Sequence, residues 1–194
     1  CKSNPSLSRP DLQFHCLPFS GDLETAAKTG KKVSDQFPGI TLAPCQTRPS
    51  SRGSIEVTGK DINAPIKMNF NYLDTELDQQ VTVAGMRWAR KIAEQGALKG
   101  IDAQEMGASA SVKTDEEYLA VAKQYGLTTH HPVGTCRMGK DADAVVNNRL
   151  QLNGIGNLRV VDASVIPSIT SGNTHAPTTM IAERAADFIL KKIN

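Results

Sequence analysis

The sequence predicts an α+β protein in which a largely antiparallel sheet is covered by helices and is followed by a C-terminal strand and helix. Three observations support this class. Short segments alternate apolar and polar residues between glycine and proline breaks. Two amphipathic patterns begin at helix-capping signals. Near the C-terminus, an apolar run precedes a helix with proline in its first turn.

Four segments have the pattern of strands. Residues 12–19 are bounded by prolines and end in a turn. Residues 40–42, 54–57 and 66–70 alternate apolar and polar side chains, and turn-forming residues connect them. We expect these three to follow one another in an antiparallel meander. Residues 22–38 are polar and rich in lysine, and they are expected to be a surface excursion.

Two helices are predicted before the C-terminal third. Thr75 and Asp78 resemble a capping box, and the apolar face behind them consists of Leu77, Val81, Ala84, Trp88 and Ile92. This helix is expected to end near Gly96 and to cover the sheet. A shorter helix is predicted to begin at Thr114 with Glu117 and to end at Gly126.

The C-terminal part has the pattern of a strand, a loop and a helix. Residues 158–162 form an apolar run that predicts a buried strand, and residues 177–192 predict a helix whose core face holds Ile181, Ala185 and Phe188. Ligands collect at the carboxyl ends of strands and anions at helix N-termini. Asp162 and the turn over residues 171–178 therefore mark a candidate site.

Composition excludes several classes of protein. The 194 residues are 39% hydrophobic, so they can bury a core, and the net charge of +2 is spread without basic runs, which argues against nucleic acid as a partner. The sequence contains no run long enough for a transmembrane segment. A soluble protein is expected, with the cytoplasm favoured. Four scattered cysteines fit neither a disulfide scaffold nor a zinc ribbon.

Three of the four histidines lie in two glycine-flanked segments, residues 128–139 (TTHHPVGTCRMG) and 171–178 (SGNTHAPT). His131 and His175, facing one pocket, could supply a general base and a partner that orients a hydroxyl group. The alternative is that each histidine only hydrogen-bonds its own loop. A metal site of His130, His131 and Cys136 is disfavoured, because adjacent residues on an extended segment point to opposite faces. No metal is expected.

Longer runs carry a resemblance to a known family. Residues 131–139 (HPVGTCRMG), 157–167 (NLRVVDASVIP) and 172–183 (GNTHAPTTMIAE) resemble the C-terminal part of the glucose-methanol-choline (GMC) family of FAD-dependent oxidoreductases. The resemblance is closest to the choline-dehydrogenase-like branch. Residues 11–15, 48–53 and 71–73 match further landmarks in the family's order.

The resemblance implies FAD as cofactor and hydride transfer from an alcohol carbon to flavin N5. His131 matches the active-site base, and His175 matches a second active-site position that is His in some members and Asn in others. Cofactor-binding positions are matched by Asp162, Ala163, Asn173, Pro177 and Thr178. His15 matches a position that lines the substrate pocket in some relatives, and His130 is a second candidate for that pocket.

The resemblance also implies that two parts of the chain have different functions. Residues 1–143 are expected to be the substrate-binding portion, with the His131 loop, and residues 144–194 to be the C-terminal segment of a FAD-binding domain. The GxGxxG motif that binds the ADP part of FAD is missing from the sequence. We therefore expect a C-terminal fragment or subunit that is active only with an N-terminal portion carried on one or more separate chains.

The expected function is that of an alcohol oxidase or dehydrogenase with oxygen, a quinone or a dye as electron acceptor. Two alternatives stay open. One is a carbon–carbon lyase on the same scaffold, as in the hydroxynitrile lyases of this family, and the other is a non-catalytic binding fragment. The sequence does not identify the alcohol, and it does not separate an oxidase from a dehydrogenase.

Overall fold

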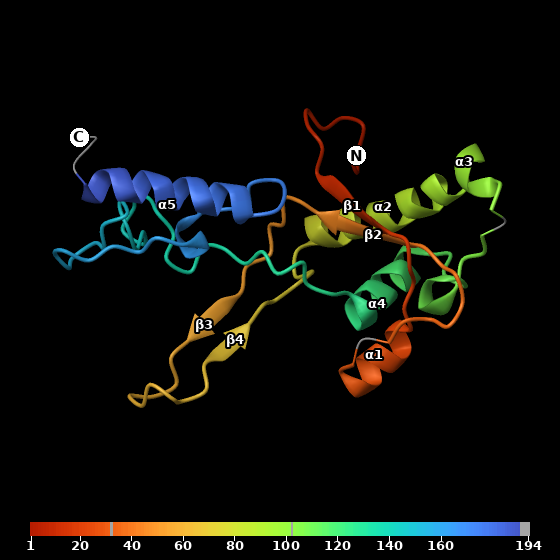
Figure 1. The fold of residues 1–194 in the computed structure, drawn as a ribbon, viewed down its shortest axis with the longest axis horizontal. Coiled ribbons are helices and arrows are strands. Elements are labelled where there is room, and N and C mark those ends of the chain that lie inside the picture. The colour runs from red at the N-terminus through yellow and green to blue at the C-terminus, as the bar shows by residue number, and fades with distance from the viewer. Residues whose placement is uncertain (32, 102, 191–194) are drawn as a thin grey trace. The chain divides into compact units, whose positions relative to one another are not determined.

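The computed structural model describes residues 1–31, 33–101 and 103–190. The chain divides into two compact units (Figure 1). Unit 1 contains Cys1–Ser51 and Leu73–Thr129, and unit 2 contains Arg52–Tyr72 and His130–Asn194. The last boundary between the two units lies between residues 129 and 130. The functional boundary expected between residues 143 and 144 stays a prediction.

Unit 1 is built on a two-stranded antiparallel sheet of β1 (Leu12–Leu17) and β2 (Thr41–Gln46). Helix α2 (Glu76–Ala93) packs on this sheet, as predicted. The approach is close at Gly85, where an added Cβ would lie 2.8 Å from Pro44 Cβ and 3.1 Å from Leu12 Cδ2. Glycine at this position therefore allows the helix to contact the strands directly.

The remaining helices of unit 1 pack on α2 or on one another. Helix α4 (Asp115–Tyr125) begins with the predicted capping box of Thr114 and Glu117 and ends at Gly126. Its Tyr118 is buried with Val83 and Val112. The short elements are α1 (Leu23–Thr29), α3 (Gly96–Lys99) and η1 (Gly107–Ser109). Helix α1 lies in the predicted surface excursion, and none of its residues is buried.

The start of α2 differs from the prediction in two ways. Thr75 caps the helix by accepting from the Asp78 N–H, but Asp78 bonds residues 50 and 51 and does not close the box. Leu77 is 53% exposed, whereas Asp78, Val81 and Gly85 are buried. The buried face is thus rotated toward Asp78, because the loop after β2 packs there.

Unit 2 begins with a hairpin of β3 (Ser54–Glu56) and β4 (Lys67–Asn69), which pair in antiparallel fashion. The expected single meander is therefore wrong: β2 pairs with β1, and the hairpin is a separate sheet. Period-two alternation indicates which residues form strands, but it does not select the partner strand.

The rest of unit 2 is mostly irregular chain packed on helix α5 (His175–Ile189) (Figure 1). Its core consists of Val146, Leu150, Val165, Ile166, Ile181 and Ala185. The strand predicted over residues 158–162 forms only an isolated bridge between Gln151 and Arg159, and Leu158 is 48% exposed. The segment leads into the short helix η2 (Ala163–Val165).

The predicted C-terminal helix begins two residues earlier than expected, at His175, and Ile181 and Ala185 form its buried face. Lys191 and Lys192, predicted at its end, lie outside the described residues. No helix within residues 1–31, 33–101 and 103–190 has the length and hydropathy needed to cross a bilayer.

Candidate active site

The side chain of His131 meets the N-terminus of α5 within unit 2. Its Nδ1 lies 2.9 Å from Thr174 Oγ1, and the Thr174 backbone N–H points at the same nitrogen with an N···N distance of 3.5 Å. Thr174 is 7% exposed, and His131 is half-buried. Because Thr174 immediately precedes His175, the two predicted catalytic histidines are brought to the same end of α5.

The loop that follows His131 is fixed to η2 by backbone hydrogen bonds. The N–H groups of Gly134 and Cys136 donate to Ser164 O at 3.1 and 3.0 Å, and the Met138 N–H donates to Val165 O at 2.9 Å. Gly134 has φ +96°, in the region that favours glycine. His131 therefore leads into a loop held against the core of unit 2, which limits its movement.

An ion pair closes this loop at its far end. The guanidinium of Arg137 binds the carboxylate of Asp141 through two hydrogen bonds, Nη1 to Oδ2 at 2.9 Å and Nη2 to Oδ1 at 2.6 Å. These bonds from Arg137 lower the pKa of Asp141 from 3.8 to about 2. Asp141 is thus ionised throughout the neutral range and keeps the turn closed.

His175 is the first residue of α5, whereas the sequence placed it two residues before the predicted start of the helix at Pro177. Its side chain is exposed, and its carbonyl accepts from Thr179 Oγ1 at 3.1 Å within the helix. The imidazole is therefore accessible, while its backbone is held by the first turn.

The N-terminus of α5 has no side-chain cap. Thr174 is at the N-cap position, and Pro177, the third helical residue, has no N–H to donate to it. The N–H groups of His175 and Ala176 then lie at the positive end of a 15-residue helix without a covering cap side chain. This end of α5 fits a ligand edge that carries negative charge.

The predicted cofactor-binding residues fall into two groups. Asn173, Pro177 and Thr178 flank the start of α5, where Thr178 Oγ1 donates to Thr174 O at 2.7 Å. Asp162 caps η2 by accepting from the N–H and hydroxyl of Ser164, and Ala163 is the first residue of that short helix. Asp162 therefore stabilises the segment to which the His131 loop is attached.

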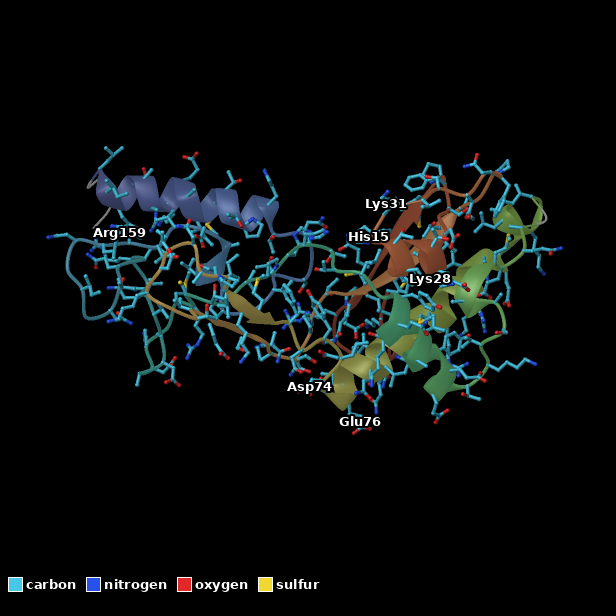
Figure 2. All side chains as sticks on the ribbon, turned by 90° about the horizontal axis from the view of Figure 1, so that it is seen from below. His15, Lys28, Lys31, Asp74, Glu76 and Arg159 are labelled. Atoms are coloured by element: carbon cyan, nitrogen blue, oxygen red, sulfur yellow. The ribbon has the colours of Figure 1, made fainter. Side chains whose placement is uncertain are left out.

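The two pocket candidates differ in location. His130, beside His131 in unit 2, is exposed and has φ +59°. His15 lies on β1 in unit 1 (Figure 2), with its Nε2 3.5 Å from Gln13 Nε2. The structure thus brings together the residues around His131 and His175 but describes His15 in a separate unit.

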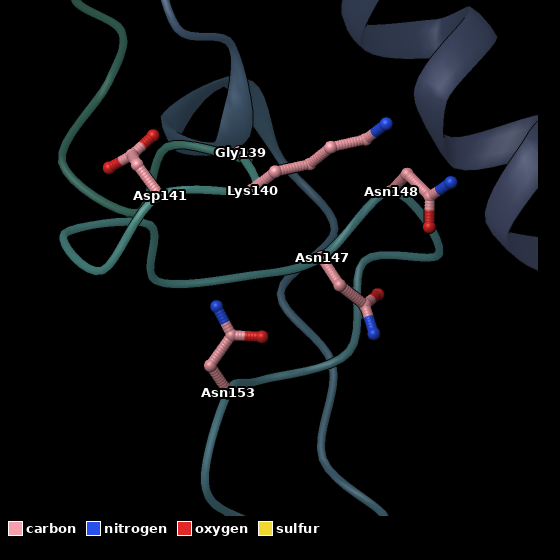
Figure 3. Close-up of a pocket in the computed structure, with 6 residues that line it drawn as sticks. All are labelled: Gly139, Lys140, Asp141, Asn147, Asn148 and Asn153. Carbon is pink, nitrogen blue, oxygen red and sulfur yellow. The ribbon is translucent and has the colours of Figure 1, made fainter.

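A cavity of about 440 Å³ opens elsewhere in unit 2 (Figure 3). Its lining residues are Gly139, Lys140, Asp141, Asn147, Asn148 and Asn153. None of the predicted site residues lines it. Within the described residues, no group of three or more His, Cys, Asp or Glu side chains gathers to hold a metal ion.

Thr174 belongs to this site but is absent from the residues that the sequence predicted for it. A signal for it exists: a threonine three residues before a proline at a helix start cannot make the usual cap bond to the third helical N–H. Its hydroxyl is then available for a different partner, and in the structure that partner is His131.

Comparison with known proteins places this site in a family. The model of the GMC oxidoreductase C-terminal domain matches residues 49–182. The chain therefore belongs to the GMC oxidoreductase family, which confirms the resemblance seen in the residues.

Individual relatives are consistent with this family. The chain is 39% identical over 194 residues to an alcohol dehydrogenase [acceptor] of Pseudomonas putida, covering 100% of this chain and 34% of that protein. It is 36% identical over 188 residues to an oxygen-dependent choline dehydrogenase of Proteus mirabilis, covering 97% of this chain and 33% of that protein. The chain thus spans about a third of the length of these relatives.

Solved structures have the same fold. Pyridoxine 4-oxidase from Mesorbium loti superposes with a TM-score of 0.85 at 27% identity, over 100% of this chain and 37% of that chain. A FAD-dependent oxidoreductase from Chaetomium thermophilum superposes with a TM-score of 0.71 at 28% identity, over 79% of this chain and 27% of that chain. The mixture of helices and antiparallel strands predicted for this chain is confirmed.

Proposed function

We propose that these residues are the C-terminal portion of a FAD-dependent alcohol oxidoreductase that acts on CH–OH groups. One observation carries the proposal: His131 is held at Nδ1 by the residue next to His175, at the uncapped start of α5. This arrangement occurs in a chain of the GMC oxidoreductase family, whose relatives include an alcohol dehydrogenase and choline dehydrogenases.

FAD, when bound, supplies the acceptor for a hydride. The residues that would hold its flavin end are Asn173, Pro177 and Thr178, and the N–H groups at the start of α5 would stabilise the negative charge that develops on the ring. Asp162 and Ala163 would approach the ribityl and pyrophosphate part. The positive end of α5 supports this orientation.

His131 would accept the hydroxyl proton of the alcohol at Nε2, because Nδ1 already contacts Thr174. His175, which is exposed at the first turn of α5, would donate a hydrogen bond to the same oxygen and stabilise the developing alkoxide. His130 and His15 are proposed to line the pocket that selects the alcohol. The anchored loop from Gly134 to Met138 would keep the base in place during turnover.

The ADP part of FAD requires residues outside these 194. No GxGxxG sequence occurs among them, and the relatives are about three times as long. We propose that an N-terminal portion supplies that site, with residues 144–194 completing the FAD-binding domain. Equilibrium titration of these 194 residues alone with FAD tests this, and tight binding without that portion would contradict it.

The experiment on function uses the complete enzyme loaded with FAD. Anaerobic stopped-flow with an alcohol panel should show flavin reduction, and His131→Ala should slow it by about 10²–10⁴. Glu183→Gln, an exposed change on α5, serves as the control and should leave the rate unaltered. Reduction of His131→Ala at the original rate would refute the role of His131.

The same experiment separates the alternatives. A hydroxynitrile-lyase-like enzyme would bind FAD but would not bleach it with any alcohol, and a non-catalytic fragment would copurify with no flavin-containing partner. Reoxidation of the reduced enzyme with oxygen, a quinone or a dye then distinguishes an oxidase from a dehydrogenase.

A further inference from the structure

Thr174 occupies the N-cap of α5 without acting as a side-chain cap. A threonine at this position usually accepts a hydrogen bond from the second or third helical N–H. Here its backbone has φ −88° and ψ −2°, a helical conformation, and the third helical residue is Pro177. Neither the local conformation nor the sequence therefore directs the hydroxyl back to the helix.

The hydroxyl instead faces the imidazole of His131. The Oγ1 to Nδ1 distance of 2.9 Å is that of a good hydrogen bond, and Thr174 is buried. The Thr174 backbone N–H also points at Nδ1, but at 3.5 Å it is the weaker contact. One buried residue thus offers Nδ1 both an oxygen and an N–H.

The two contacts differ in the tautomers of His131 that they allow. The backbone N–H can only donate, so it favours a lone pair on Nδ1, which leaves the hydrogen on Nε2 and makes that nitrogen unable to accept a proton. The hydroxyl, at 2.9 Å the nearer partner, can either donate to Nδ1 or accept from Nδ1–H. Only the second arrangement leaves on Nε2 the lone pair that a base requires, and Thr174 Oγ1 is the group that makes it possible.

We propose that Thr174 is a positioning residue that holds the hydrogen of neutral His131 on Nδ1 and so keeps Nε2 ready to act as base. The inference rests on the proposed role of His131. In the reaction the alcohol O–H bond would break, its proton would form a bond to Nε2, and its electron pair would form the second bond of the carbonyl group as the carbinol hydrogen leaves with its own electron pair to FAD. The Nδ1–H of the resulting imidazolium keeps Thr174 Oγ1 as its acceptor, so the same contact serves both protonation states.

Two substitutions in the complete FAD-loaded enzyme test this role. Thr174→Val keeps the branched shape and removes the hydroxyl, and it should lower the rate of flavin reduction at saturating alcohol about 10-fold to 100-fold with little change in KM. Thr174→Ser restores a hydroxyl and should return the rate to within about threefold of the original. A merely structural role would not give this rescue.

The second readout does not depend on turnover. Nitrogen-15 NMR of histidine-labelled enzyme reports which ring nitrogen of His131 carries hydrogen, with His131→Asn used to assign the signals. The original enzyme and Thr174→Ser should show hydrogen on Nδ1, and Thr174→Val should shift the population toward Nε2–H. Hydrogen on Nε2 in the original enzyme would overturn the inference, even if Thr174→Val fails to fold.

The outcomes distinguish this inference from the proposed function. If Thr174→Val keeps both the rate and the tautomer while His131→Ala loses activity, the positioning role is refuted and the base remains. If His131→Ala keeps the rate, the proposed function is refuted, whatever the tautomer proves to be.

Discussion

Ser50 donates two hydrogen bonds to one carboxylate oxygen of Asp78, from its backbone N–H at 2.8 Å and from its hydroxyl at 2.9 Å. Gln46 Nε2 reaches the same oxygen at 2.9 Å, and the Ser51 N–H donates to the other oxygen at 2.8 Å. Asp78 is 2% exposed. This carboxylate attaches the end of β2 and the loop after it to the start of α2.

Replacement of Asp78 should destabilise unit 1. Asp78→Asn keeps the size but removes the charge and places an amide donor against N–H groups, so we expect a loss of about 2–3 kcal/mol in the free energy of unfolding. Asp74→Asn, a nearby change at an exposed residue before α2 (Figure 2), is the matched control and should stay within about 0.5 kcal/mol. Urea unfolding of both variants measures the difference, and equal midpoints would contradict the assignment.

Asp78 should also make stability depend on pH. Burial raises its pKa, but hydrogen bonds from Ser50, Ser51 and Gln46 outweigh this and hold the pKa well below the ordinary 3.8. A lowered folded-state pKa contributes stability that is complete above the unfolded value and is lost as pH falls toward the folded value. Unfolding measured from pH 6 down to pH 2 should therefore show a decline below about 4 that Asp78→Asn reduces.

Replacement of Gly85 by alanine should disturb the packing of α2 on the sheet. Gly85→Ala would raise helix propensity by about 1 kcal/mol, but its methyl group would meet Pro44 Cβ at 2.8 Å and Leu12 Cδ2 at 3.1 Å. We expect net destabilisation of about 1–2 kcal/mol, since strands β1 and β2 must shift. At Gly96 an added Cβ meets nothing within 4 Å, so Gly96→Ala is the control. Thermal unfolding that favours Gly85→Ala would show that α2 is not in close contact with the sheet.

The ion pair with Arg137 should be visible in the titration of the Asp141 carboxyl group. Carbon-13 NMR should find the Asp141 carboxyl titrating near pH 2, because Arg137 lowers its pKa to about 2. Arg137→Gln should return this pKa toward 3.8, whereas Lys140→Gln, an adjacent loss of positive charge, should change it little. A similar shift of the Asp141 pKa in both variants would indicate that the overall positive charge nearby lowers this pKa, and not the ion pair with Arg137.

Two substitutions of His175 in the complete enzyme should differ in the rate of flavin reduction. The resemblance to the GMC family predicts His in some members and Asn in others at this position, and both side chains can donate a hydrogen bond to an oxygen. We expect His175→Asn to slow flavin reduction by less than about 10-fold and His175→Ala by about 10²-fold or more. Anaerobic stopped-flow measures both. Equal losses would mean that the imidazole does more than donate a hydrogen bond.

Local chemistry made several features predictable. The capping box of Thr114 and Glu117 and the end of α4 at Gly126 involve neighbouring residues, so a short window of sequence contains the whole signal. The order of the motifs around His131 and His175 was likewise sufficient to identify the GMC family. Strand partners were not predictable, because β1 and β2 are joined by a long connection and alternation does not encode pairing.

By itself the sequence determined the family, the candidate histidines and the positions of the three longest helices, α2, α4 and α5, since each depends on residues that are close along the chain. Only the tertiary structure decided that Thr174 contacts His131 across 43 residues and that Asp78 turns from its own helix to the loop after β2. The physical reason is the same in both cases. A buried hydroxyl or carboxylate must have hydrogen-bonding partners, and the tertiary fold decides which groups lie close enough to be those partners.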